Sequence, residues 1–246
     1  MAKRGATEAG PAEQRRLWQA KPGVRAVYED YFRRLAGWCR PGRTLEIGAG
    51  SGNLAGHLGE VLASDIVAMP WLDVVADAHA MPFANGSLAN IVMVDTLHHL
   101  ARPGVFLAET QRVLAPGGRV VMLEPGVTPL SGLFYRLFHP EPVDFSFDPL
   151  SDAASPDKDP AVGNQAVPER LFGRDRGRLT ARFPALTVIA RQRLSLIAYP
   201  ASGGFRRWSL LPHGFAAPLL AVEDAVMPLL GPLAAFRLLV VLERGD

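Results

Sequence analysis

The chain has 246 residues, of which 48% are hydrophobic, and its 26 basic and 24 acidic residues give a formal net charge of +2. This length and composition suit one large α/β domain with embellishments, and the near balance of charge argues against nucleic acid as the main partner. Cys39 is the single cysteine, so an intrachain disulfide is excluded, and because the first forty residues lack a signal-peptide apolar core we expect a cytoplasmic protein.

The N-terminal part predicts two helices followed by a strand. Apolar residues recur at steps of three and four over residues 15–38, with a break at Pro22 and Gly23. Residues 44–47 then predict a strand that runs into a glycine-rich turn, and residues 54–58 predict the start of a helix.

The next segments alternate between strands and helices. Strands are predicted at residues 61–65, 72–77, 89–95 and 119–123, and a helix at residues 105–114. Nearly continuous apolar strands are typical of a parallel sheet covered on both faces. The alternation therefore predicts an α/β fold, a Rossmann-like doubly wound sheet.

The second half is less regular, and residues 126–165 are rich in Pro, Asp and Ser, which predicts a loop or lid. Beyond it we expect a helix at residues 168–183, a strand at 186–199, one or two helices at 215–230, and a last antiparallel strand at 236–242. The apolar run from residue 215 to 240 is interrupted by charged residues and prolines, so we expect no membrane insertion.

Together these segments predict a single domain over residues 1–246 with a mostly parallel seven-stranded sheet. Its core would comprise about residues 40–125 and 183–246, with a lid at about 126–182 and the N-terminal helices over the cofactor.

The first strand carries the most informative motif. After Glu46 the chain turns through Gly48, Gly50 and Gly52, which lets bare backbone approach a ligand above the strand end. The dinucleotide fingerprint requires a third glycine where this chain has Asn53. Glu46 would repel a pyrophosphate but attract the ammonium and sulfonium charges of S-adenosylmethionine (SAM).

These residues resemble the acid-x-Gly-x-Gly-x-Gly motif of the class I SAM-dependent methyltransferases, particularly the small-molecule group. The resemblance continues through Asp65 at the second strand end and through residues 77–83, which are similar to the family's Asp-Ala-x-x-Leu-Pro-Phe. Residues 90–100 and the Leu-x-Pro-Gly-Gly turn within residues 112–119 also resemble the family. The match spans about residues 40–125 in the family's order.

The resemblance implies SAM as cofactor and S-adenosylhomocysteine as product. It implies that Asp65 accepts hydrogen bonds from the ribose hydroxyls, that Ile66 lies against adenine, and that Asp77 binds the adenine amino group. The short link from Ile66 to Trp71 departs from the family because it leaves little room for the usual helix. The expected cofactor-binding residues are Glu46, Gly48, Ala49, Gly50, Gly52, Asn53, Asp65, Ile66, Asp77, Ala78, Asp95 and Thr96.

Catalytic candidates lie at the ends of the fourth and fifth strands. Methyl transfer needs alignment, desolvation and a base where the acceptor carries a proton. His98 and His99 follow the fourth strand and Glu124 closes the fifth. An imidazole titrates near neutral pH, and family members with a histidine in this segment often use it as general base or to orient the acceptor hydroxyl. Which of the two histidines faces the acceptor stays open, and the other is expected to cap or pack the next helix.

The lid holds a second polar group, made of His139, Glu141 and Asp144. A divalent metal site is one interpretation, but the flanking prolines hold the segment extended so that neighbouring ligands point apart. We therefore expect no metal and a lid loop. Asn164 and Gln165 are expected either to bind the acceptor or to cap the loop.

The region from Tyr199 to Phe205, with Trp208 and the apolar run from Phe215, predicts an acceptor cover, with plain core or a homodimer face as alternatives. We predict SAM-dependent methyl transfer to a small, partly apolar metabolite, with oxygen slightly favoured over nitrogen or carbon. The alternatives are a catalytically silent SAM-fold binding protein and an NAD(P)-dependent oxidoreductase.

Overall fold

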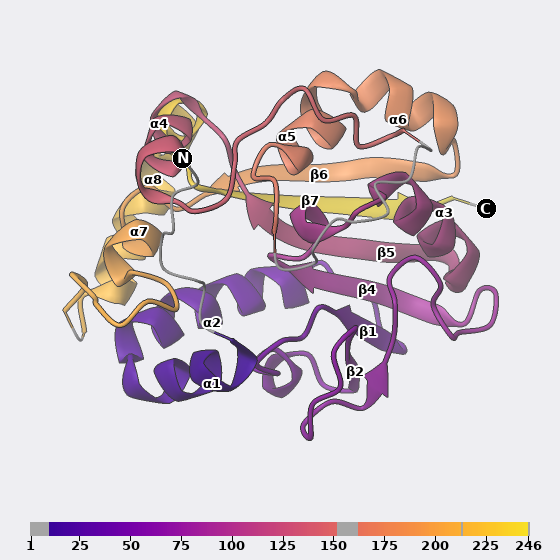
Figure 1. Cartoon of the computed structure of the whole chain (residues 1–246), viewed down its shortest axis with the longest axis horizontal. Helices are drawn as coiled ribbons and strands as arrows, with labels where there is room; N and C mark the ends of the chain where they lie inside the picture. The colour runs from indigo at the N-terminus through magenta and orange to yellow at the C-terminus, as the bar shows by residue number, and fades with distance from the viewer. Residues whose placement is uncertain (1–9, 152–161, 213, 246) are drawn as a thin grey trace.

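The computed structural model describes residues 10–151, 162–212 and 214–245 (Figure 1). A seven-stranded sheet runs through it in the order β3-β2-β1-β4-β5-β7-β6. The pairs among the first five strands are parallel, whereas β7 is antiparallel to both β5 and β6. The strands are β1 Thr44–Ile47, β2 Val61–Asp65, β3 Val74–Val75, β4 Leu88–Val94, β5 Leu114–Pro125, β6 Leu186–Leu194 and β7 Arg237–Arg244.

Helices cover both faces of this sheet, as the apolar strands predict. Along β4, Ile91 and Met93 point to one face and Val92 to the other, because successive side chains of a strand alternate. The first face packs against α3 (Pro103–Val113), α5 (Val167–Glu169) and α6 (Arg176–Arg182). The other packs against α2 (Pro22–Ala36), α7 (Ala198–Ser202) and α8 (Ala216–Ala234).

The predicted N-terminal helices are present as α1 (Pro11–Ala20) and α2. Pro22 opens the second helix, where its missing N–H costs nothing. Arg15 on α1 donates from Nη1 to the carbonyl of Ser51 at 3.3 Å. The N-terminal helices therefore lie beside the glycine-rich turn, as expected.

The prediction of a loop over residues 126–165 is wrong at its start, because helix α4 spans Pro129–Phe138. Thr128 and Ser131 form a reciprocal capping box, and Pro129 occupies the first turn. Apolar residues at Leu130, Leu133 and Leu137 follow at helical spacing. These signals were present in the sequence, but the Pro- and Asp-rich residues that follow obscured them.

Four other segments differ from the sequence-based expectation. The helix expected at residues 54–58 is only a short 3₁₀ turn, Ala55–His57, and the third strand is reduced to Val74–Val75. The strand expected at residues 186–199 ends at Leu194 because the chain turns into α7. A π-helical turn, Arg170–Arg174, interrupts the helix expected at 168–183.

Helix α8 forms one continuous helix in spite of Pro228 and Pro232. By length and apolar composition it is the one helix in the described ranges that meets the criteria for crossing a membrane, and 22% of the window that meets them is buried in the fold. Core helices of soluble proteins meet the same criteria.

Candidate active site

The glycine-rich turn sits where the ends of β1, β2 and β4 meet. Gly48 has a φ of 71°, and a Cβ at this position would collide with the side chain of Thr96. The amide of Gly50 donates to Asp65 Oδ2 at 3.0 Å, and Ala49 donates to the carbonyl of Ser64 at 2.9 Å. The turn is thus held against β2 on one side and against the residue after β4 on the other.

Glu46 lies beneath this turn with 4% of its surface exposed. Its Oε2 atom has no hydrogen-bond partner among the described residues. Burial, with the nearby charge of Asp65, raises the pKa of Glu46 to about 8. A buried carboxylate oxygen without a partner is costly, and a cationic ligand would satisfy it. The residues present therefore fit SAM.

Of the two acids expected at the next strand ends, Asp65 closes β2 as predicted, whereas Asp77 lies two residues beyond the end of β3. Asp65 ends β2, and its Oδ1 accepts from the amide of Val67 at 3.1 Å. Asp77 pairs with the imidazole of His79 at 2.7 Å. Burial would raise the pKa of Asp77, but the hydrogen bonds from the amide and ring of His79 outweigh it and lower that pKa.

The other predicted cofactor residues vary in their surroundings. Ile66 is 53% exposed after β2, and Ala78 is buried in the core beside Asp77. Asn53 donates from its side chain to Ser51 Oγ at 2.7 Å, so it stabilises the turn. Trp71, which the sequence did not single out, donates from Nε1 to the carbonyl of Gly50 at 2.8 Å.

The end of β4 carries a buried ion pair that sequence reasoning missed. Asp95 has a positive φ of 53°, and its Oδ1 lies 2.6 Å from Nη1 of Arg237 on β7. The guanidinium also stacks over the ring of Tyr199 at 4.8 Å. A lone arginine at the start of an otherwise apolar strand was the available signal. The Asp95 carboxylate is therefore paired within the chain, with Arg237. The hydroxyl of the adjacent Thr96 donates to the carbonyl of Val94 at 3.0 Å.

His98 and Glu124 meet, as the sequence predicts. The Nδ1 atom of His98 lies 2.7 Å from Glu124 Oε2, and both side chains are almost fully buried. The other oxygen of Glu124 accepts from the amides of Thr96 at 3.0 Å and Leu97 at 2.8 Å. Three backbone and side-chain donors thus fix the Glu124 carboxylate at the end of β5.

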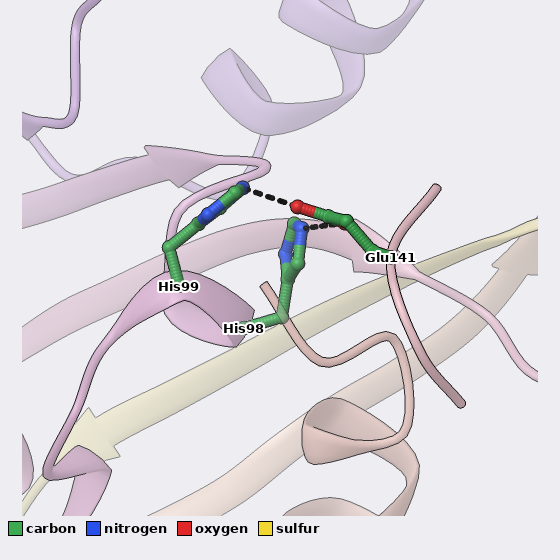
Figure 2. Close-up of side chains that lie close together, drawn as sticks. All are labelled: His98, His99 and Glu141. Carbon is green, nitrogen blue, oxygen red and sulfur yellow. Dashed lines mark ion pairs between the residues drawn. The ribbon is translucent and has the colours of Figure 1, made fainter. Parts of the chain in front are cut away.

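Glu141, from the segment after α4, completes the arrangement (Figure 2). Its carboxylate oxygens lie 3.4 Å from His98 Nε2 and 3.4 Å from His99 Nε2. The amide of Gly163 donates to Glu141 Oε1 at 2.9 Å, and the side chain of Gln165 donates to Oε2. We call His98, His99, Glu124 and Glu141 the His–Glu cluster.

Burial and the neighbouring charges shift the pKa values of the side chains in this cluster. Burial would lower the pKa of His98, but hydrogen bonds to Glu124 and Glu141, together with their charges, outweigh it and raise that pKa to about 10. Burial and the charge of His98 lower the pKa of His99. Burial would raise the pKa of Glu141, but His98 and the other imidazoles outweigh it and lower the pKa to about 2. His98 is thus held between two carboxylates, and His99, with 22% of its side chain exposed, is the more accessible imidazole.

The lid residues divide between the cluster and the loop. Asp144 turns away, and its carboxylate accepts from the amide of Ser146 at 2.7 Å. His139 stays near Glu141, with Nδ1 at 3.9 Å from Oε2. Asn164 accepts from the amides of Asp144 and Ala166, so it caps the loop. The expectation that neighbouring lid ligands point apart therefore holds for Asp144, but the partner of Glu141 comes from the end of β4.

Several known proteins similar to this chain are methyltransferases. Residues 45–122 match the family described as Methyltransferase domain. The chain is 33% identical over 121 residues to the demethylmenaquinone methyltransferase of Thermus thermophilus, an alignment that covers 40% of this chain and 54% of that protein. It is 29% identical over 152 residues to the ubiquinone/menaquinone biosynthesis C-methyltransferase of Azotobacter vinelandii, covering 52% of this chain and 59% of that protein. The chain thus spans about half the length of these curated relatives.

The fold is similar to that of a SAM-dependent methyltransferase from Archaeoglobus fulgidus, with a TM-score of 0.56 and 13% identity over 93% of this chain and 98% of that one. Residues 45–122 therefore match a methyltransferase family, and together with the fold this match supports a class I SAM-dependent methyltransferase.

Proposed function

We propose that this protein transfers a methyl group from SAM to a hydroxyl oxygen of a small, partly apolar metabolite, such as a phenol or enol. The observation that carries the proposal is the 2.7 Å contact between His98 and Glu124, which places an oriented imidazole at the ends of β4 and β5, beside the glycine-rich turn. The curated relatives are named as a demethylmenaquinone methyltransferase and a ubiquinone/menaquinone biosynthesis C-methyltransferase, which supports a small, partly apolar acceptor; the second name assigns methylation to carbon in that relative.

SAM, when bound, supplies a methyl group on a positively charged sulfur and is left as the neutral thioether S-adenosylhomocysteine. The task of the chain's own residues is to bind, orient and deprotonate the acceptor. With SAM bound, the acceptor O–H would lose its proton to the imidazole of His99, the freed electron pair of the oxygen would form the new oxygen–carbon bond, and the electrons of the sulfur–carbon bond would stay on sulfur. Glu124 positions His98, and the more accessible His99 faces the acceptor.

At the cofactor end, we propose that Glu46 meets the positive charge of SAM. Asp65, Ile66 and Asp77 would bind the ribose and adenine, as the family resemblance implies. The amides of the glycine-rich turn, Ala49 and Gly50 among them, line the same side. Because Asp95 is paired with Arg237, Asp95 and Thr96 would contribute by holding the end of β4 in position at the cofactor site.

Radiolabelled SAM, offered with a panel of phenols and enols, tests the reaction. The wild-type chain should give a labelled product that mass spectrometry identifies as one methyl group heavier and that NMR identifies as an ether. Glu124→Gln should lower the turnover by about 10²–10⁴-fold with SAM affinity unchanged, because it weakens the orientation of the imidazole. Glu60→Gln is the matched control at an exposed carboxyl and should behave as wild type. Equal turnover in Glu124→Gln and wild type would refute the proposed role of the cluster, and a product methylated on carbon would refute the oxygen acceptor.

A further inference from the structure

The His–Glu cluster contains three side chains with the geometry of metal ligands. The ligand atoms of His98, His99 and Glu141 all lie within 4.8 Å of one another. His98 and His99 come from the 3₁₀ turn Leu97–His99. Glu141 lies on a separate stretch of chain and points toward both imidazoles (Figure 2). Both imidazole Nε2 atoms are directed at the one carboxylate.

The contacts of His98 and His99 with Glu141 are longer than a typical charge-assisted hydrogen bond. A charge-assisted N–H···O bond is about 2.7–2.9 Å long. His98 Nε2 and His99 Nε2 each lie 3.4 Å from an oxygen of Glu141. Two ligands bonded to a tetrahedral Zn²⁺ at about 2.0–2.1 Å are roughly 3.3–3.4 Å apart. Each imidazole contacts a different oxygen of Glu141 at a distance close to that of two ligands on one ion, and the three ligand atoms lie within 4.8 Å of one another.

The surroundings of the ligands match those of known metal sites. A metal-binding histidine usually donates its second ring N–H to a carboxylate, which fixes the tautomer and turns the other nitrogen toward the ion. Glu124 takes this place on His98, at 2.7 Å from Nδ1, and two backbone amides hold Glu124 in turn. The Glu141 carboxylate is likewise oriented by the amide of Gly163 and by Gln165.

The charges of the buried side chains also favour a bound cation. The Glu124 and Glu141 side chains are 0% and 6% exposed, and His98 is 3% exposed. Metal binding requires neutral imidazoles, so with His98 deprotonated the two positive charges of a divalent cation would face the two buried carboxylates. Two imidazole nitrogens and one carboxylate oxygen form a donor set suited to Zn²⁺ and to first-row transition ions rather than to Mg²⁺ or Ca²⁺.

We propose that His98, His99 and Glu141 bind one divalent transition-metal ion, with Glu124 as the positioning residue of His98. This differs from the sequence-based expectation of no metal. Three protein ligands leave one tetrahedral position for an outside group, as in catalytic zinc sites. This inference deepens the proposed function, and its last step rests on that proposal. In that step an acceptor hydroxyl oxygen would bind at the open position, and the ion would favour loss of the hydroxyl proton.

Direct metal binding tests the site without SAM or acceptor. The full-length chain is treated with a chelator, dialysed and titrated with Co²⁺, whose visible d–d bands report tetrahedral coordination, and then with Zn²⁺ against a chromophoric chelator. We expect one ion per chain, X-ray absorption showing two imidazole ligands, and a higher midpoint of thermal unfolding with Zn²⁺ because the ion binds only the folded chain.

Variants assign the ligands. His99→Ala and Glu141→Gln should remove the Co²⁺ bands, and Glu124→Gln should weaken binding by about 10–100-fold. His57→Ala is the matched control, because His57 lies outside the cluster on the turn Ala55–His57, and it should bind Co²⁺ as wild type does. Circular dichroism of each metal-free variant shows that it is folded, so a loss of binding is read only from folded chains.

The outcomes separate this inference from the proposed function. A folded, chelator-treated wild type that takes up neither ion, or binding that survives in both His99→Ala and Glu141→Gln, overturns the metal site and identifies the cluster as a metal-free imidazole between two carboxylates. Methyl transfer at full rate by the chelator-treated chain would overturn the role of the ion in deprotonating the acceptor and leave the proposed function standing. Binding of the ion without methyl transfer to any acceptor would support the site and count against the proposed function.

Discussion

Asp95 Oδ1 lies 2.6 Å from Nη1 of Arg237, an ion pair that ties the end of β4 to the start of β7 across the intervening strand β5. Arg237 is 1% exposed, and its Nε and Nη2 atoms have no hydrogen-bond partner among the described residues. The pair therefore holds together the part of the sheet that carries the His–Glu cluster.

Removing the charge of Asp95 should destabilise the fold. Asp95→Asn keeps the size of the side chain and its tolerance of a positive φ, but leaves a buried guanidinium without its counter-charge, at a cost of about 3 kcal/mol in the free energy of unfolding. Urea denaturation measures it. Glu29→Gln, which disrupts the exposed pair with Arg25 at 3.8 Å, is the control and should change little. A loss as small as that of the control would show that the Asp95–Arg237 pair contributes nothing.

Glu46 should make the stability of the ligand-free protein depend on pH. Its pKa is raised from 4.5 to about 8, so between these values the folded chain keeps a proton that the unfolded chain releases. Stability should therefore fall as the pH rises from 4.5 to about 8 and be steady above that. In Glu46→Gln this component should be absent, while affinity for SAM should drop by about 10–100-fold because a charged partner is lost. Thermal unfolding from pH 5 to 9 and calorimetric titration with SAM check both. Superimposable pH profiles of the variant and wild type would contradict the assignment.

Gly163 should not tolerate a side chain. A Cβ there would fall 2.5 Å from His98 Cδ2 and 2.6 Å from Glu141 Oε1, and neither buried group has room to move. Gly163→Ala should lower the free energy of unfolding by about 1–3 kcal/mol, as overpacking does, and should reduce methyl transfer. At Gly177 a Cβ would meet nothing within 4 Å, so Gly177→Ala should leave activity unchanged and add about 0.4–1 kcal/mol of stability. The same effect at both positions would contradict the crowding around the cluster.

Helix α4 should depend on its capping box. Thr128→Ala removes the acceptor for the Ser131 amide, a bond of 3.3 Å, and should cost about 0.5–2 kcal/mol. Chemical denaturation of this variant, compared with Thr180→Ala at an exposed position on α6, checks the value. Because α4 leads directly to His139 and Glu141, Thr128→Ala should also lower turnover slightly. A variant as stable as Thr180→Ala would count against the cap.

The sequence predicted β1 and β2 of the cofactor half closely, but it overestimated the helix after β1 and the length of β3. β1 and β2 begin and end where their apolar runs do, and Glu46, the glycines and Asp65 meet because the carboxyl ends of adjacent parallel strands share one edge of a sheet. His98 and Glu124 were likewise predicted together, since β4 and β5 are neighbours. In each case the pattern is local and the sheet topology supplies the contact.

The sequence by itself therefore determined the fold class and the mostly parallel sheet, and it predicts the place where SAM would bind, because periodicity and strand-end motifs are short-range signals. Only the tertiary structure brought Glu141 to His98 and His99, and Arg237 to Asp95. Those contacts join segments far apart in the chain, and their geometry depends on how α4 and the following loop pack and on the antiparallel return of β7, which no local pattern encodes.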